Sequence, residues 1–160
     1  MVIDLRKHEN EKLYHALYSD IFAAEDRVYK LFKKYNDPNF DDRSRTKFTA
    51  QCDAYVRAAG DTIIGRHVAE YYGACSVERV LDADGVDVTN RYFLDACYGI
   101  ERLYGPDLKV NDEEILSNCA YVFEIRRRFE DFGIDTSDSS VFFFNDPDRF
   151  KLIDFETRAY

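Results

Sequence analysis

Two short apolar runs near the C-terminal end of the sequence, residues 141–144 and 150–153, flank a polar segment, residues 145–149. The polar segment contains proline, which fixes φ, together with asparagine and aspartate, whose side chains favour turns. This pattern predicts a β-hairpin with a loop of five residues. Because a hairpin brings its two outer ends together, we expect Asp135, before the first strand, to lie close to Asp154, after the second.

Residues 21–24 and 27–33 are two further apolar runs that are rich in β-forming side chains and meet at a Glu-Asp pair. They predict two strands, and Lys30 lies inside the second. One interpretation of Lys30 is a lysine that points into a phosphate site. The other is an exposed strand lysine on an alternating face, and the periodicity favours that second interpretation.

Helical periodicity appears twice. Residues 43–59 carry an apolar stripe at helical spacing and end before Gly60. Residues 111–132 predict a long helix, in which Asn111 caps the N-terminus, Glu114 follows three residues later, and Gly133 ends the helix.

The remaining segments complete an α+β chain. Residues 77–82 and 91–100 predict strands around a polar turn, whereas residues 4–19 look like a weakly helical or irregular lead-in and residues 62–76 like a connecting segment. With 160 residues and no repeat or linker, we expect residues 1–160 to form a single domain.

Composition and net charge limit the kinds of partner and the cellular compartment that we expect. The formal net charge of −9 argues against nucleic acid or an anionic membrane surface as a partner; it permits a basic protein partner but does not require one. No apolar run approaches the ~20 residues that a membrane span needs, and the N-terminus shows no signal sequence. We therefore expect an intracellular, cytoplasmic protein. The four cysteines are scattered and form no C-x-x-C pair, so we expect free thiols and no zinc site.

Two carboxylates at strand ends suggest a metal or acid–base site. The two carboxylates, Asp135 and Asp154, supply the oxygen ligands that Mg²⁺ prefers, or one of them would accept a hydroxyl proton while the other holds the metal. The alternative is that Asp135 and Asp138 cap turns and that Asp154 is an acid at a strand end. The hairpin alone favours the alternative.

The segment K-L-I-D-F-E, residues 151–156, resembles the strand and D-F-G motif of the protein-kinase-like fold, and residues 133–141 resemble its catalytic loop, H-R-D-x-x-x-x-N. The resemblance implies that Asp135 is the catalytic base and that Ser140 and Asp154 bind the metal. It departs from the family at three places: Gly-Ile replaces His-Arg before Asp135, Ser140 replaces asparagine, and Glu156 replaces glycine.

The same resemblance extends towards the N-terminus. V-Y-K-L-F looks like the strand that carries the ATP-contacting lysine, which implies that Lys30 binds nucleotide phosphate. Residues 97–105 resemble the hinge between the two lobes, so that the backbone from Glu101 to Leu103 would meet adenine; a strand that enters a Gly-Pro turn is the alternative. No glycine precedes Gly60, and no glutamate lies between residues 43 and 59 to pair with the lysine.

The resemblance therefore implies a truncated kinase-like domain: an antiparallel small lobe with one helix over residues 1–100, then a hinge, one long helix and a β-hairpin of a large lobe over residues 101–160. We expect a pseudokinase-type binding or regulatory protein that acts through protein contacts. One alternative is a minimal phosphotransferase that uses ATP and Mg²⁺. The other is an acidic inhibitor that mimics nucleic acid, although the acids are interleaved with 22 Lys and Arg residues.

Overall fold

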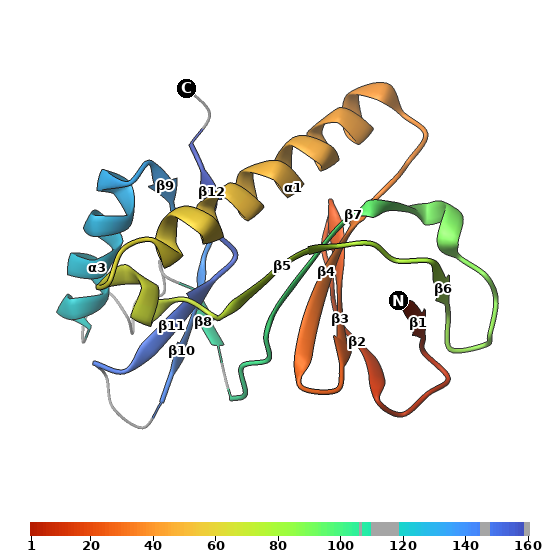
Figure 1. Cartoon of the computed structure of the whole chain (residues 1–160), viewed down its shortest axis with the longest axis horizontal. Coiled ribbons are helices and arrows are strands. Elements are labelled where there is room, and N and C mark those ends of the chain that lie inside the picture. Colours follow the sequence, from red (N-terminus) through yellow and green to blue (C-terminus); the bar gives the residue numbers. More distant parts are fainter. Residues whose placement is uncertain (106, 110–118, 145–147, 159–160) are drawn as a thin grey trace. The chain divides into compact units, whose positions relative to one another are not determined.

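The computed structural model describes residues 1–105, 107–109, 119–144 and 148–158. These residues form an α+β structure of mostly antiparallel strands with two α-helices, α1 and α3 (Figure 1). The chain divides into two compact units. The first comprises Met1–Thr49 and Tyr72–Arg102, and the second comprises Ala50–Tyr71 and Leu103–Tyr160.

A five-stranded sheet organises the first unit. Its order is β2-β3-β4-β7-β5, and the pairings β2–β3, β3–β4 and β4–β7 are antiparallel. The predicted strands at residues 21–24 and 27–33 are confirmed as β3 and β4, which form a hairpin. The strands are β2 (Asn10–His15), β3 (Ser19–Ala24), β4 (Arg27–Lys33), β7 (Tyr92–Glu101) and β5 (Tyr71–Cys75).

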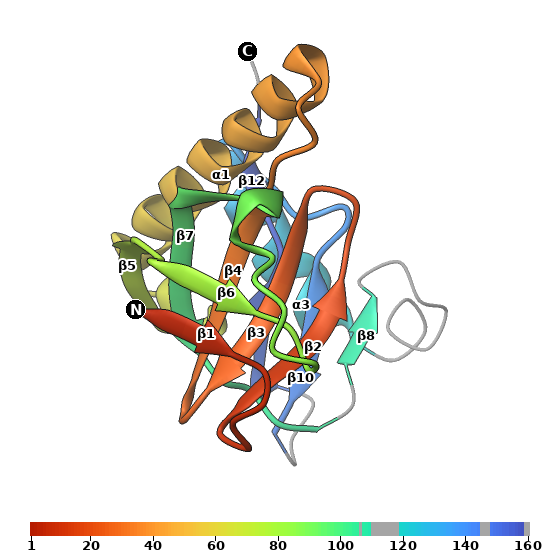
Figure 2. The ribbon, with the colours of Figure 1, turned by 90° about the vertical axis from the view of Figure 1, so that its right-hand side faces the viewer.

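A second, parallel pair lies in the same unit. β1 (Val2–Asp4) pairs with β6 (Arg79–Leu81), as Figure 2 shows from the side. The short helix η2 (Thr89–Arg91) follows β6 and leads into β7. An apolar core joins these elements, and its buried residues are Ile3, Phe22, Leu31, Val77, Val80, Val88, Tyr92 and Cys97.

Two predictions about strands in this unit were wrong. The lead-in, residues 4–19, contains strand β2 and not helical or irregular chain, and the connecting segment, residues 62–76, contains strand β5. Both are the outer strands of the sheet. Most side chains of β2 are exposed, so burial imposes no apolar alternation on its sequence.

Helix α1 (Pro38–Ala59) confirms the helix predicted at residues 43–59 but begins earlier. A side-chain oxygen of Asp37 accepts the N–H of Phe40 at 3.0 Å, and proline then occupies the first helical position. The first half of α1 packs on the sheet: the Ser44 hydroxyl donates to the carbonyl of Lys33 at 2.8 Å, and Phe48 packs edge-on against Phe32.

The second unit contains the predicted hairpin. β10 (Ser140–Phe143) and β11 (Phe150–Ile153) are antiparallel, which confirms the prediction, and β8 (Asp107–Lys109) adds a third strand. Residues 145–147 of the predicted loop lie outside the described residues. A separate pair, β9 (Ile134–Asp135) and β12 (Glu156–Thr157), lies at the outer ends of the hairpin.

Helix α3 (Ala120–Asp131) precedes β9 and buries Val122, Ile125 and Phe129. Its end agrees with the prediction, since Gly133 has a φ of 71° and its N–H donates to the carbonyl of Glu130. The prediction of one helix over residues 111–132 was wrong at Cys119, whose φ of −128° is not helical, so that α3 begins only at Ala120. The predicted start at residues 111–114 lies outside the described residues. The short helix η1 (Ile64–His67) follows α1. Neither helix of the described ranges is long and apolar enough to cross a membrane.

Candidate functional site

The three predicted site residues of the second unit lie in adjacent segments at the outer ends of the β10–β11 hairpin. Asp135 in β9 is paired with Glu156 in β12, two residues after Asp154. The buried Ser139 hydroxyl donates to the carbonyl of Asp154 at 3.2 Å, and Ser140 begins β10 beside it. The geometry therefore places Asp135, Ser140 and Asp154 at one end of the hairpin.

The carboxylate of Asp135 is engaged by its own loop. One of its oxygens accepts the N–H of Ser137 at 2.8 Å. This hydrogen bond lowers the pKa of Asp135, and the nearby guanidinium groups of Arg158 and Arg126 lower it further. The side chain thus caps a turn, as the alternative interpretation expected. A carboxylate whose pKa is lowered is a weaker proton acceptor.

Asp154 adopts a backbone conformation that few residues other than glycine adopt. Its φ is 64°, in the left-handed region, where aspartate is tolerated better than most side chains. The next residue, Phe155, is 1% exposed, and its ring lies 4.5 Å from that of Tyr55 and 5.4 Å from that of Phe129. The buried ring of Phe155 therefore holds the backbone of the 154–156 segment in place.

A resident metal does not fit the described residues. Among them, no group of three His, Cys, Asp or Glu side chains is arranged to hold a metal ion. Ser140 is 4% exposed and supplies a hydroxyl, so Asp154 would be the charged ligand of the predicted pair. Mg²⁺ held by one carboxylate commonly takes its remaining ligands from substrate phosphates and water.

Lys30 lies in the first unit, in the middle of β4, opposite Ile21 and Tyr98. It is 7% exposed, so the interpretation as an exposed strand lysine was wrong. Its ammonium lies 5.9 Å from the centre of the Phe32 ring, on the face of the strand that packs against α1. The predicted phosphate contact of Lys30 stays a prediction.

The two hairpin turns that precede Lys30 in the chain contain no glycine. In the first turn, residues 16–18, each carbonyl accepts a hydrogen bond. The Lys33 ammonium donates to Ala16, the Tyr35 hydroxyl to Leu17 at 3.0 Å, and the Lys33 N–H to Tyr18 at 2.8 Å. This turn is therefore fastened to β4 and to the segment that leads into α1.

A further hydrogen bond to this turn, from Ser44, can be removed by a single substitution. The buried Ser44 hydroxyl lies within hydrogen-bond distance of the carbonyls of both Tyr18 and Lys33. We expect Ser44→Ala to lower the free energy of unfolding by about 1–3 kcal/mol, because buried acceptors lose a donor. Urea denaturation followed by circular dichroism measures the change. Thr49→Ala, which removes an exposed hydroxyl on the same helix, is the matched control, and an equal effect of the two substitutions would contradict the prediction.

The predicted hinge lies where the chain passes from the first unit to the second. Glu101 is the last residue of β7 and pairs with Arg27. Leu103 is the first residue of the second stretch of chain that belongs to the second unit. Between them, the Arg102 N–H donates to the carbonyl of Asp26, and its guanidinium contacts Glu11 at 3.3 Å. Pro106 of the alternative Gly-Pro turn lies outside the described residues.

Sequence reasoning missed a buried charge cluster around Asp20. Asp20 is 1% exposed, and its carboxylate accepts hydrogen bonds from the Tyr92 hydroxyl at 2.6 Å and from the ammonium groups of Lys12 at 2.9 Å and Lys33 at 3.0 Å. His15 also contacts it, at 2.7 Å. The residues come from four strands, β2, β3, β4 and β7, so only the register of the sheet brings them together.

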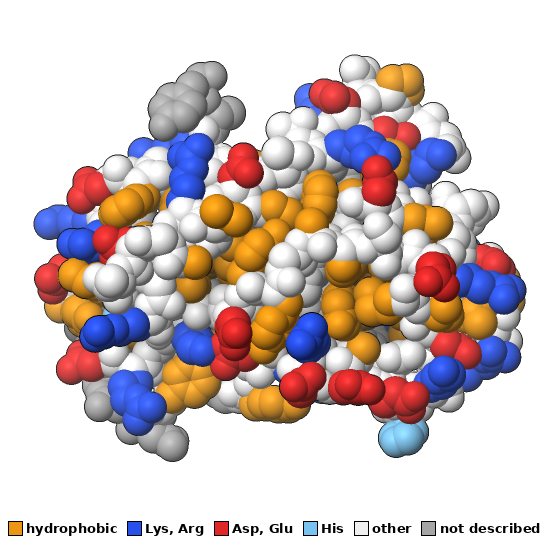
Figure 3. All heavy atoms as spheres, in the orientation of Figure 1, with side chains coloured by type: hydrophobic (Ala, Val, Ile, Leu, Met, Phe, Trp, Pro, Cys, Tyr) orange, Lys and Arg blue, Asp and Glu red, His pale blue; other side chains and the backbone are white. Residues whose placement is uncertain are grey.

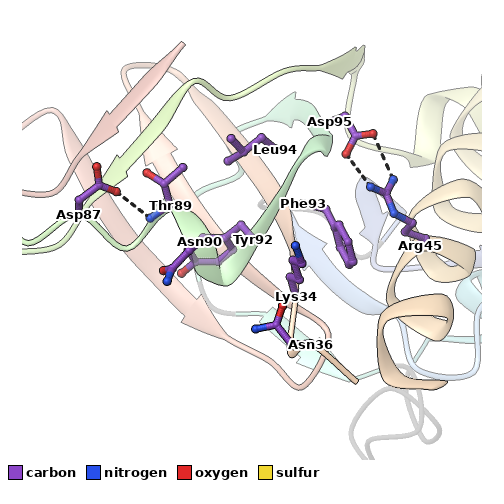
Figure 4. A pocket seen from close by; sticks show the side chains of 10 residues that line it. All are labelled: Lys34, Asn36, Arg45, Asp87, Thr89, Asn90, Tyr92, Phe93, Leu94 and Asp95. Carbon is purple, nitrogen blue, oxygen red and sulfur yellow. Dashed lines mark hydrogen bonds and ion pairs between the residues drawn. The ribbon is translucent and has the colours of Figure 1, made fainter. Parts of the chain in front are cut away.

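A cavity of about 710 Å³ opens on the first unit (Figure 4). Arg45 of α1 reaches towards Asp95 of β7 with contacts of 3.1 and 3.2 Å, and its guanidinium lies 4.1 Å from the centre of the Phe93 ring. No sequence motif marked this cavity. The lining residues are Lys34, Asn36, Arg45, Asp87, Thr89, Asn90, Tyr92, Phe93, Leu94 and Asp95.

No protein-family model matches the chain, and a search of curated proteins found no match either.

Proposed function

We propose that the chain is a kinase-like, pseudokinase-type binding or regulatory module that acts through protein contacts and does not transfer phosphate. The observation that carries this proposal is the turn at residues 16–18. In protein kinases a glycine-rich loop covers the nucleotide phosphates. Here the turns before Lys30 have no glycine, and the carbonyls of the first are taken up by hydrogen bonds within the unit.

The order of the elements supports the kinase-like part of the proposal. The strand that carries Lys30 is followed by helix α1, by further strands of the same sheet, by the passage between units at Arg102 and Leu103, and by helix α3. The loop after Asp135 and the segment after β11 come next, in the order that the resemblance requires. A five-stranded sheet with α1 packed on it is also what this fold requires.

The electrostatics of the hairpin end support the loss of catalysis. Glu156 stands where the family has glycine, and it lies opposite Asp135 in the β9–β12 pair. Carboxylates at opposed positions of a strand pair repel each other. The Asp135 carboxylate is also occupied by the N–H of Ser137. This hydrogen bond stabilises the ionised form of Asp135 and so makes it a weaker base.

The acidic end of the first unit suggests the chemistry of the partner. We use this name for Glu9, Glu11, Glu25, Asp26 and Glu101, which the register of β2, β3, β4 and β7 brings to one end of the sheet. Figure 3 shows acidic side chains along the lower edge of the face drawn there. Exposed charges of one sign accelerate and orient the approach of a surface of the opposite sign. A protein with a basic surface is therefore the partner that we propose.

The second candidate function is a minimal phosphotransferase, and the burial of Lys30 favours it. In that case Lys30 would bind phosphate, Asp135 would act as the base, and Asp154 with Ser140 would bind magnesium. The backbone from Glu101 to Leu103 would meet adenine. Lys30 is a buried cation in the central part of a sheet, where lysine side chains are rare.

A turnover experiment separates the two functions. We expect the purified chain with ATP and Mg²⁺ to show no phosphate transfer and no ATP hydrolysis above background, and we expect Lys30→Ala and Asp154→Asn to give the same result. Turnover by the native chain that is lost in Asp154→Asn would overturn the proposal in favour of the enzyme. A calorimetric titration with ATP, with and without Mg²⁺, then tells whether a nucleotide site is retained without catalysis.

A charge-matched pair of variants tests the partner chemistry. We expect a lysine-rich peptide to bind the native chain more tightly at low salt, and Glu25→Lys with Asp26→Lys to weaken that binding at least about fivefold through loss of local attraction. Asp42→Lys with Asp53→Lys changes the net charge equally on exposed positions of α1. Equal weakening in both double variants would mean that only net charge matters and would remove the acidic end as the site.

A further inference from the structure

Two of the four cysteines lie on neighbouring strands of the first unit. Cys75 ends β5 and Cys97 lies within β7, and these strands are hydrogen-bonded neighbours in the five-stranded sheet. The pairing continues beyond β5, since the N–H of Val77 donates to the carbonyl of Leu94 at 2.8 Å. Both cysteines pack against the same apolar core. The two thiols therefore lie on one face of the sheet.

A hydrogen bond from the Cys97 thiol lowers the pKa of Cys75, which agrees with the placement of the two thiols on neighbouring strands. Neighbouring strands lie about 4.7–4.9 Å apart, within the range of about 4.4–6.8 Å over which a disulfide bridges two Cα atoms.

The two thiols differ in exposure. Cys97 is fully buried, whereas Cys75 is only half-buried, so a small reagent in solvent reaches Cys75 first. The hydrogen bond from Cys97 also lowers the pKa of Cys75 to about 7, although burial acts in the opposite direction. Because the thiolate is the nucleophile, Cys75 is the residue of the pair that is set up to react.

We propose that Cys75 is an oxidative modification site for peroxide and that Cys97 resolves its oxidised form as a Cys75–Cys97 disulfide. In the first step the Cys75 thiolate attacks one oxygen of hydrogen peroxide, an S–O bond forms, the O–O bond breaks, and the hydroxide that leaves takes up a proton to become water. In the second step the Cys97 sulfur attacks the Cys75 sulfenic acid, an S–S bond forms, and the hydroxyl leaves as a second water with the proton of Cys97. The two sulfurs together lose two electrons, which reduce the peroxide.

The disulfide would act on a defined part of the first unit. It ties the outer strand β5 to β7 and closes residues 76–96 into a loop. This loop contains β6, η2 and the stretch from Asp87 to Asp95 that contributes to the cavity of Figure 4. Oxidation would thus restrict the motion of one wall of that cavity and leave the covalent structure of the second unit unchanged.

Peptide mapping under non-reducing conditions tests the proposal on the full chain. Hydrogen peroxide at neutral pH should produce a cross-linked peptide pair that contains Cys75 and Cys97, with the loss of two hydrogens and full reversal by dithiothreitol. Cys52 and Cys119, which are also half-buried, provide internal comparisons and should remain free thiols. Oxidation of Cys52 or Cys119 ahead of Cys75, or a sulfinic acid at Cys75 without a disulfide, would overturn the proposal.

Two variants separate the roles of the cysteines. In Cys97→Val the resolving thiol is absent, so Cys75 should accumulate as a sulfenic acid that dimedone traps; in Cys75→Ser no disulfide should form.

Cys97→Val should also slow alkylation of Cys75 at pH 7 by about fivefold. A rise in pKa to the ordinary 9.0 removes about 50-fold of thiolate, and the greater nucleophilicity of the more basic thiol restores about eightfold. An unchanged alkylation rate would show that the hydrogen bond does not activate Cys75. The mapping of the native chain remains decisive if the valine variant fails to fold.

Discussion

Replacing Asp20 with alanine is expected to lower the free energy of unfolding by about 3–5 kcal/mol, because the substitution leaves the ammonium of Lys33 buried without its carboxylate. Asp20 is 1% exposed and Lys33 is 5% exposed, and their charged atoms lie 3.0 Å apart. The hydroxyl of Tyr92 also loses its acceptor, at 2.6 Å. Urea denaturation followed by circular dichroism measures the loss, and loss of folding altogether would agree with it.

Asp95→Ala is the matched control for this substitution. Asp95 forms an ion pair with Arg45 in the same unit, but both side chains are about half exposed or more. Exposed ion pairs contribute about 0–1 kcal/mol, so this variant should unfold close to the native protein. If Asp20→Ala cost no more than Asp95→Ala, the buried cluster around Asp20 would not be a principal support of the first unit.

The same cluster predicts how stability depends on pH. Burial on its own would raise the pKa of Asp20, but hydrogen bonds from Tyr92, Lys12 and Lys33 outweigh it and hold the pKa below the ordinary value of 3.8. Because the folded state binds the proton less readily than the unfolded state, the contribution of Asp20 is complete above about pH 3.8 and is lost as the pH falls further. The acid limb of the native stability curve should therefore be steeper than that of Asp20→Ala.

Local patterns predicted the elements that are held together by neighbouring parts of the sequence. The hairpin of β10 and β11 has both strands and its turn within residues 140–153, and β3 and β4 meet at a short turn. The apolar stripe of α1 was visible at helical spacing, although its first turn was missed. The Asp37–Pro38 pair that begins the helix is a start signal that a stripe alone does not contain.

Features that depend on distant pairing could not be predicted in this way. The alternation in β4 suggested that Lys30 is exposed, but Leu31 faces the apolar core while Phe32, beside Lys30, meets α1. A strand that is covered on both faces loses the alternation of a half-exposed strand. The Asp20 cluster and the Cys75–Cys97 pair likewise arise from strand register, which no single segment encodes.

At the hairpin end, sequence placed the carboxylates but not their hydrogen-bond partners. The adjacency of Asp135 and Asp154 followed from hairpin geometry alone, whereas the capture of Asp135 by the N–H of Ser137 depends on the conformation of one loop. The burial of Phe155 depends on packing from α1 and α3, which are distant in sequence. The chemistry of this site thus depends on a loop conformation and on tertiary packing, which sequence motifs do not specify.

Replacing Phe155 with alanine is expected to lower the free energy of unfolding of the second unit by about 3–5 kcal/mol. The ring is 1% exposed and packs against Tyr55 and Phe129, so its removal leaves a cavity between α1 and α3. Phe155→Leu keeps most of the apolar volume and should cost less than about 1.5 kcal/mol. The measurement is urea denaturation together with hydrogen exchange, in which the amides of α3 should exchange faster in the alanine variant.

Phe132→Ala is the control that distinguishes packing from the simple loss of an aromatic residue. Phe132 follows α3 and is 40% exposed, so its replacement should cost less than about 1 kcal/mol. The comparison also bears on the candidate site, because Phe155 fixes the backbone that carries Asp154 in its left-handed conformation. If Phe155→Ala and Phe132→Ala had equal effects on stability and on exchange in α3, the 154–156 segment would not be anchored by its aromatic ring.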